Sequence, residues 1–324
     1  MRPLSSYSYF TYTLNNALYV PFTSRCTTRQ TLPSTRGPNF LMPSEAVASL
    51  CRLRDVERQL EGCSPKWEPW CQWLDTVEYA QKLPNPMEPL MELPIDEPSP
   101  LIPGEDGRRP TVSELWKELE PIFADKDTDQ ESDDNKQHIS KISSIVIAGE
   151  GEPLLRLSSL LQLVKTIRQT ERNKNMKQPM SLRINTNGLV RWTVDDFSEI
   201  LKDYNTGKEN DDTTSKAIVD AANVPELLYK AGINVVSVAI MTHDANQYNE
   251  LMGPIVPDAH AHVCRFVQQA VSIQKLQQEN DNSPQPFHVE LTAVDRSDVD
   301  KKKTQKFVES LGVTAPIRWR PYFP

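Results

Sequence analysis

Six short apolar runs recur along the 324-residue chain, and they restrict its fold more than any other feature of the sequence. The runs are rich in β-branched residues, and segments with helical periodicity separate them. They span residues 18–22, 144–148, 182–185, 235–241, 287–294 and 317–322. Continuous apolar runs, unlike alternating ones, are typical of strands buried on both faces of a parallel sheet. The sequence therefore predicts an α/β fold, either a partial barrel or an open doubly wound sheet.

Helical patterns lie between these runs. The predicted helices span residues 111–122, 157–168, 225–231, 262–277 and 301–311. Thr111 followed by Glu114 has the spacing of a capping box, in which each side chain bonds the other residue's backbone N–H. Gly232 and Gly312 follow two of these helices and are typical C-terminal glycines. This alternation of strand and helix predicts a single domain over residues 1–324.

Three segments interrupt the alternation. Residues 43–110 form an insertion: a helix with Ser44 as its N-cap, a tryptophan cluster at Trp67, Trp70 and Trp73, and a Pro-rich linker. The tryptophans are interpreted as packing on the domain. Residues 124–138 and 203–216 are acidic, polar stretches that predict disordered loops.

Charge and cysteine content exclude several classes of protein. The 36 Lys and Arg residues against 44 Asp and Glu give a net charge of −8, which argues against direct nucleic-acid binding. No run of about 18 apolar residues occurs, so we predict no membrane association.

Five cysteines without a repeated spacing suggest a reducing compartment. We predict a cytoplasmic protein. An organelle is the alternative, because the first 44 residues lack acidic side chains, as transit peptides do.

Polar residues follow two of the predicted strands. Gly151, Glu152 and Pro153 come shortly after the run 144–148, and Asn185 and Thr186 end the next strand. Ligands of parallel α/β sheets bind beyond the carboxyl ends of the strands, where both loops would lie. Each motif is equally compatible with a simple turn, and Asn187-Gly188 suits a positive φ angle. These loops are therefore a candidate binding site.

Several longer motifs resemble one known family. They are LYVPFTSRC (18–26), RGPNF (36–40), IVIAGEGEPLLRL (145–157), LRINTNGLV (182–190), VVSVAIMTHDANQYNELMGP (235–254), VELTAVD (289–295) and RWRPY (318–322). In order and spacing they resemble the TatD-associated radical SAM proteins. The resemblance implies a partial (β/α)6 barrel that binds S-adenosylmethionine (SAM) at the carboxyl ends of its strands. It also implies association with a TatD-type nuclease.

The same resemblance implies which residues bind the cofactors. Gly151, Glu152 and Pro153 would hold the methionyl amino group of SAM. Asn185, Thr186 and Ser237 would be polar residues near the ligand, and Val294 would lie near the adenine. Cys26 matches the first ligand of the family's [4Fe–4S] cluster, which a Cys-x3-Cys-x2-Cys loop binds.

The cluster loop departs from the family pattern. The second cysteine position falls on Gln30 and the third on Leu32 and Pro33. Iron–sulfur clusters require thiolate ligands, which an amide and a pyrrolidine ring cannot replace. Cysteines of the insertion do not reproduce the loop spacing. We therefore predict that the cluster is lost or weakened, and that the reductive SAM cleavage implied by the resemblance is inefficient.

Two other functions remain open. The first is a non-catalytic binding or scaffold protein that retains the barrel and uses the Pro-rich insertion for contacts. The second is a metal-dependent hydrolase that uses the His-x-His pair of His260 and His262. That pair opens a predicted helix, where its imidazoles would point about 200° apart. We therefore interpret it as a helix start.

Overall fold

The computed structural model describes residues 10–23, 26–30, 34–60, 110–124, 142–176, 178–189, 224–254, 258–279 and 286–324. Within these residues, seven strands form one sheet whose spatial order is the chain order. The strands are β1 (Tyr12–Leu14), β2 (Ala17–Val20), β3 (Ser144–Ile147), β4 (Ser181–Thr186), β5 (Val235–Ala239), β6 (His288–Asp295) and β7 (Arg318–Pro321). Strands β2 to β7 run parallel, and β1 pairs antiparallel with β2. A doubly wound sheet would reverse its strand order at one point, so the observed order favours the partial barrel.

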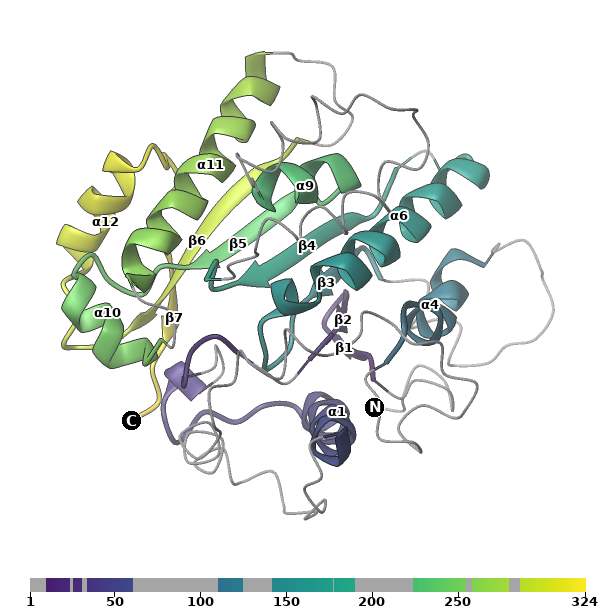
Figure 1. The fold of residues 1–324 in the computed structure, drawn as a ribbon, viewed down its shortest axis with the longest axis horizontal. Helices are drawn as coiled ribbons and strands as arrows, with labels where there is room; N and C mark the ends of the chain where they lie inside the picture. Colours follow the sequence, from purple (N-terminus) through teal and green to yellow (C-terminus); the bar gives the residue numbers. More distant parts are fainter. Residues whose placement is uncertain are drawn as a thin grey trace.

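The helices lie mainly on one side of this curled sheet (Figure 1). Helices α4 (Val112–Leu119), α6 (Leu157–Asn173), α9 (Val224–Ala231) and α11 (Ala259–Glu279) contact one another in that order. Helices α10 (Ala245–Met252) and α12 (Lys301–Ser310) lie at the β6–β7 end, and α1 (Ser44–Leu60) contacts β1. Short 3-10 turns occur at Ser34–Arg36 (η1), Glu120–Phe123 (η2) and Pro153–Arg156 (η3).

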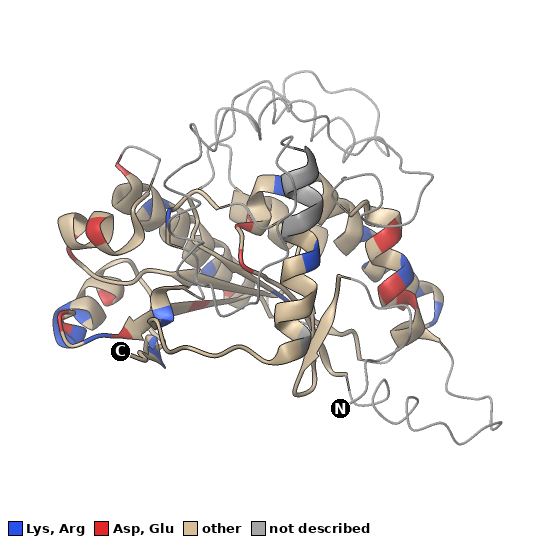
Figure 2. Ribbon diagram, turned by 90° about the horizontal axis from the view of Figure 1, so that it is seen from below, with Lys and Arg blue, Asp and Glu red and all other residues tan. Residues whose placement is uncertain are grey.

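The two faces of the sheet differ in chemistry. Leu182 and Ile184 of β4 and Val236 of β5 are fully buried with side chains of the covering helices. Alternate strand residues face the other way, and we call that side the inner face. The register aligns Asn185 of β4, Ser237 of β5 and Glu290 of β6 in one row across the inner face. Charged side chains therefore occur on the strands of the sheet as well as on the helices (Figure 2).

Most of the local predictions are confirmed. Thr111 and Glu114 form the capping box of α4, and Gly232 and Gly312 follow α9 and α12 with φ angles of 108° and 90°. All six predicted strands are present. Strand β1 and helix α10 were not predicted. The tryptophan cluster, most of the Pro-rich linker and both acidic loops, except Ala124, lie outside the described residues.

The loop after β2 meets the end of the chain. The Phe323 N–H donates to the Arg36 carbonyl at 2.7 Å, and the Asn39 N–H donates to the Phe323 carbonyl at 3.3 Å. The Arg36 Nε also donates to the Pro321 carbonyl at 2.7 Å. These bonds join the segments that follow the first and last parallel strands. No helix among the described residues is long and apolar enough to span a bilayer.

Candidate functional site

Glu152 is the buried acidic residue at the centre of the candidate site. It follows β3 and caps η3, where its Oε1 accepts the Leu154 N–H at 3.0 Å. The same oxygen accepts the Thr186 hydroxyl at 2.7 Å, and Oε2 accepts the Asn187 N–H at 2.7 Å. Burial raises the pKa of Glu152 to about 7, although the three hydrogen bonds oppose the rise. A carboxylate accepts about four hydrogen bonds, so one acceptor position stays available for a ligand.

Three buried polar atoms near this region lack a hydrogen-bond partner among the described residues. They are Asn185 Oδ1, Ser237 Oγ and the Tyr248 hydroxyl oxygen. Asn185 and Ser237 are adjacent in the register of β4 and β5. Tyr248 of α10 is fully buried; burial raises its pKa, and the proximity of Cys26 and Glu152 raises it further. Buried polar groups without partners are uncommon and costly, so Asn185 Oδ1 and Ser237 Oγ indicate a ligand on the inner face.

The other residues predicted to contact SAM have different positions in the structure. Thr186 is fully buried and its hydroxyl binds Glu152, so it positions the carboxylate. The Gly151 N–H donates to the Thr23 carbonyl at 3.2 Å, which fixes the loop between β3 and η3 against the end of β2. Pro153 is the first residue of η3. Val294 is buried near the carboxyl end of β6, beside Arg320 of β7. The structure therefore brings Glu152, Thr186 and Asn187 into direct contact and places Val294 on a more distant strand.

Cys26 lies in the same region, and no other cysteine that the structure describes contacts its thiol. Its Sγ lies 3.1 Å from the Thr28 hydroxyl and 3.4 Å from Asn187 Nδ2. Burial, together with the nearby Glu152, raises the pKa of the thiol to about 11, although hydrogen bonds with Thr28 and Thr27 oppose the rise. In the absence of a metal ion, these surroundings favour the neutral thiol.

The residues around Cys26 do not suit an iron–sulfur cluster. The Gln30 amide oxygen accepts the Ser34 hydroxyl at 3.0 Å, and its backbone N–H donates to the Met252 carbonyl at 3.1 Å. No group of three His, Cys, Asp or Glu side chains within the described ranges could hold a metal ion. Leu32 and Pro33 lie outside these ranges, and neither side chain carries a ligand atom. We therefore derive no chemistry from a cluster.

The His-x-His pair does not converge on a common point. His260 is buried, its Nε2 lies 3.1 Å from the Thr242 carbonyl oxygen, and its ring stacks on Phe307 at 5.4 Å. His262 lies near the surface, where its ring contacts Arg265. The helix begins at Ala259, as the helix-start interpretation predicts. These contacts account for both imidazoles without a metal ion.

Two residues of the site were not predicted as functional. Asn187 was interpreted as part of a turn, yet its Nδ2 donates to Thr27 Oγ1 at 3.0 Å and links the β2 loop to β4. Tyr248 lies on a helix that was not predicted. Asp244, which accepts the Gln247 N–H, and Gly253, with a φ angle of 53°, cap that helix and were the available sequence signals.

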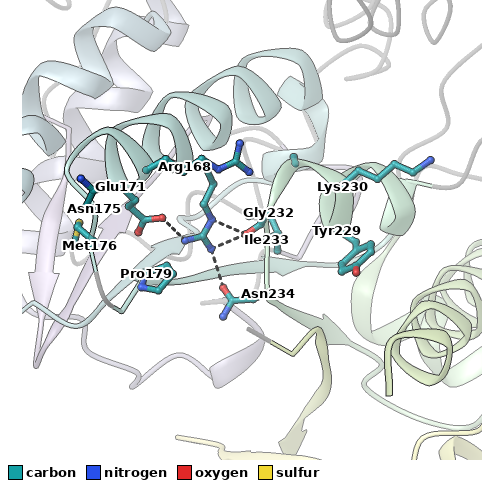
Figure 3. A pocket seen from close by; sticks show the side chains of 12 residues that line it. Arg168, Glu171, Asn175, Met176, Pro179, Tyr229, Lys230, Gly232, Ile233 and Asn234 are labelled. Carbon is teal, nitrogen blue, oxygen red and sulfur yellow. Dashed lines mark hydrogen bonds and ion pairs between the residues drawn. The ribbon is translucent and has the colours of Figure 1, made fainter. Parts of the chain in front are cut away.

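A separate pocket of about 860 Å³ lies at the opposite, amino-terminal edge of β4 and β5 (Figure 3). Arg168 reaches across it from α6. It donates to the Gly232 carbonyl at 2.6 and 3.0 Å, to Glu171 at 2.7 Å and to the Met180 carbonyl at 3.0 Å. The guanidinium thus joins helix α6 to the start of β4 and the turn before β5. Because these donors are already paired, we assign the Arg168 contacts a structural role.

Comparisons with known proteins add little to this geometry. No protein-family model matches the chain, and no curated protein matches it. Among solved structures, one described as TYW1 with a lysine-pyruvate adduct bound is similar, with 9% identity and a TM-score of 0.38. The match covers 96% of this chain and 66% of that chain. Similarity at this level carries no argument about function, so the site is interpreted from its own residues.

Proposed function

We propose that this chain binds SAM at the carboxyl ends of β3, β4, β5 and β6, and that it does so without an iron–sulfur cluster. The observation that supports this most directly is that the buried atoms Asn185 Oδ1 and Ser237 Oγ have no hydrogen-bond partner in the described part of the chain. Both lie on the inner face, and they are adjacent in the register of β4 and β5. A ligand that places hydrogen-bond donors here would remove the cost of burying both atoms.

SAM has the matching groups. Its methionyl ammonium is a donor that the remaining acceptor position of Glu152 can bind, and its ribose hydroxyls can donate to Asn185 and Ser237. An ammonium beside Glu152 would also favour the charged form of a carboxylate that burial otherwise disfavours. Bound SAM would supply a sulfonium centre with activated carbon–sulfur bonds. The residues of this chain would bind that molecule, orient it and exclude water.

Isothermal titration calorimetry with SAM and with S-adenosylhomocysteine tests the proposal. We expect micromolar to submillimolar binding by the wild-type protein. Ser237→Ala and Asn185→Ala should each weaken it about fivefold or more, as expected for the loss of one hydrogen bond in a buried site. Thr13→Val is the matched control, because the Thr13 hydroxyl is also buried with no partner among the residues that the structure describes, but lies on the β1 edge strand. This control should bind SAM within about twofold of wild type.

Two results would contradict the proposal. One is the absence of binding at millimolar ligand by a protein that unfolds cooperatively. The other is equal affinity in wild type, Ser237→Ala and Asn185→Ala. Either result would leave the scaffold function predicted from the sequence as the better explanation of the barrel.

A further inference from the structure

A cluster of arginines lies on the inner face, toward its β7 edge. Arg318 and Arg320 alternate on β7 with Trp319, which packs against the core on the helix side of the sheet. Arg183 lies on the inner face of β4, and Arg36 of η1 reaches the same edge, where its Nε binds the Pro321 carbonyl. Of the described strand residues on this face, Glu290 is the one carboxylate. The cluster therefore has more positive than negative groups.

Both carboxylate oxygens of Glu290 form hydrogen bonds with one of these arginines. Its two oxygens accept Arg183 Nη1 at 2.6 Å and Nη2 at 2.9 Å, which is a bidentate ion pair. The nearest atom of Arg318, Nη2, is 3.9 Å from Glu290 Oε2, beyond hydrogen-bond distance. Glu290 therefore forms a close pair with Arg183 and a longer ion pair with Arg318, and it forms none with Arg320 among the described residues.

Arg320 is the least compensated member of the cluster. It is half-buried and has no hydrogen bond or ion pair with any residue that the structure describes. Burial, together with the positive charges of Arg318, Arg36 and Arg183, lowers its pKa to about 10, while Tyr19 acts in the opposite direction. A guanidinium has five N–H donors, and keeping them from water without acceptors is costly. The position of Arg320 therefore indicates a missing anionic partner.

The geometry points to a site in which Arg36, Arg318 and Arg320 bind the phosphate or carboxylate group of a small molecule. Planar guanidinium forks suit such oxyanions better than an ammonium does, because they donate two parallel hydrogen bonds. The Arg36 guanidinium is already oriented, since it lies over the Phe40 ring at 4.5 Å and binds the Pro321 carbonyl. The net charge of −8 favours a small anion over a nucleic acid.

This inference goes beyond the proposed function, because the arginines would bind an oxyanion whether or not the chain binds SAM. Arg320 is paired in register with Val294 near the carboxyl end of β6. The anion would therefore lie at the same edge of the sheet as Glu152 but several strands away from it. If both sites are occupied, the arginine site would hold a second ligand beside SAM.

Calorimetry and thermal unfolding at low ionic strength, with inorganic phosphate and succinate as separate probes, test the site. We expect saturable binding of at least one probe by wild type, with a rise in melting temperature. Arg320→Met and Arg318→Met should each weaken that binding tenfold or more. Arg265→Gln removes a charge from the exposed side of α11 and should change the affinity less than twofold. Phosphate binding without succinate binding would assign a phosphorylated ligand, and the reverse a carboxylate.

The stability of the unliganded variants separates binding from a structural role. Without anion, Arg320→Met should melt at or above the wild-type temperature, because it removes an uncompensated cation. A lower melting temperature, together with unchanged anion affinity, would overturn the inference. So would a protein that binds neither probe but loses SAM affinity in Arg320→Met, since the arginines would then serve the carboxylate of SAM itself. Loss of SAM binding in Ser237→Ala with anion binding intact would leave both conclusions standing.

Discussion

The ionisation of Glu152 should make the stability of the protein depend on pH. Its folded-state pKa of about 7 lies above its ordinary value of 4.5 because the carboxyl group is buried. The folded protein therefore holds this proton more tightly than the unfolded chain does. This contribution is present in full below about pH 4.5 and is lost as the pH rises through 7, at a cost of about 3 kcal/mol.

Urea unfolding at pH 5, 6, 7 and 8 measures this dependence. Glu152→Gln cannot ionise, so its free energy of unfolding should vary less with pH over this range. The difference between the two proteins isolates the contribution of Glu152 from those of the other ionisable groups. Parallel pH profiles for wild type and Glu152→Gln would show that the carboxyl group is not buried in the folded protein.

Removal of one oxygen atom, the hydroxyl of Tyr248, gives a second test of the structure. Its ring is fully buried in the core, and its hydroxyl has no partner among the described residues. Tyr248→Phe keeps the ring and removes an unsatisfied polar group, so it should raise the free energy of unfolding by about 1 kcal/mol. Tyr229→Phe, at a half-buried position, is the control and should stay within about 0.5 kcal/mol of wild type. A loss of stability in Tyr248→Phe would show that the hydroxyl has a partner.

The contact between η1 and the chain end depends on one glycine. Gly37 has a φ angle of 100°, and a Cβ placed on it would lie 2.1 Å from the Phe323 carbonyl oxygen. Gly37→Ala therefore meets both backbone strain and a clash, and we expect it to lower the free energy of unfolding by about 2 kcal/mol or more.

A double-mutant cycle in urea separates the two causes. Removal of residues 322–324 eliminates the clash but leaves the strained φ angle. The cost of Gly37→Ala should therefore be smaller in the shortened chain than in the full chain. An equal cost in both would show that the contact between this loop and Phe323 does not form.

Elements with strong periodicity could be predicted from the sequence, and short ones could not. Helix α6 repeats apolar residues on one face, and β3 is a continuous apolar run between polar segments, so both have clear patterns. Strand β1 has three residues and depends on a turn in which Asn15 has a φ angle of 54°. Its stability comes from pairing with β2 and from packing against α1, and neither contact is visible in its own sequence.

At the scale of the whole molecule, the curl of the sheet determines which residues meet. Asn185 and Ser237 could be predicted to lie close together, because each lies near the carboxyl end of one of two neighbouring parallel strands. The arginine cluster could not be predicted from the sequence. Arg36 donates to the carbonyl of Pro321, which is 285 residues away, across the open side of the sheet. Local sequence patterns do not contain the curvature that brings these two segments together.

The distribution of thiols over the whole chain leads to the last prediction. The three described cysteines lie on separate elements: Cys26 in the loop after β2, Cys51 on α1 and Cys264 on α11. The protein reconstituted anaerobically with iron and sulfide should therefore bind far fewer than four irons and lack the brown colour of a [4Fe–4S] cluster. Gln30→Cys combined with Pro33→Cys recreates the Cys-x3-Cys-x2-Cys spacing from Cys26 and should take up more iron. A wild-type protein that binds four irons, and loses them in Cys26→Ser, would show that thiols from other segments complete the site.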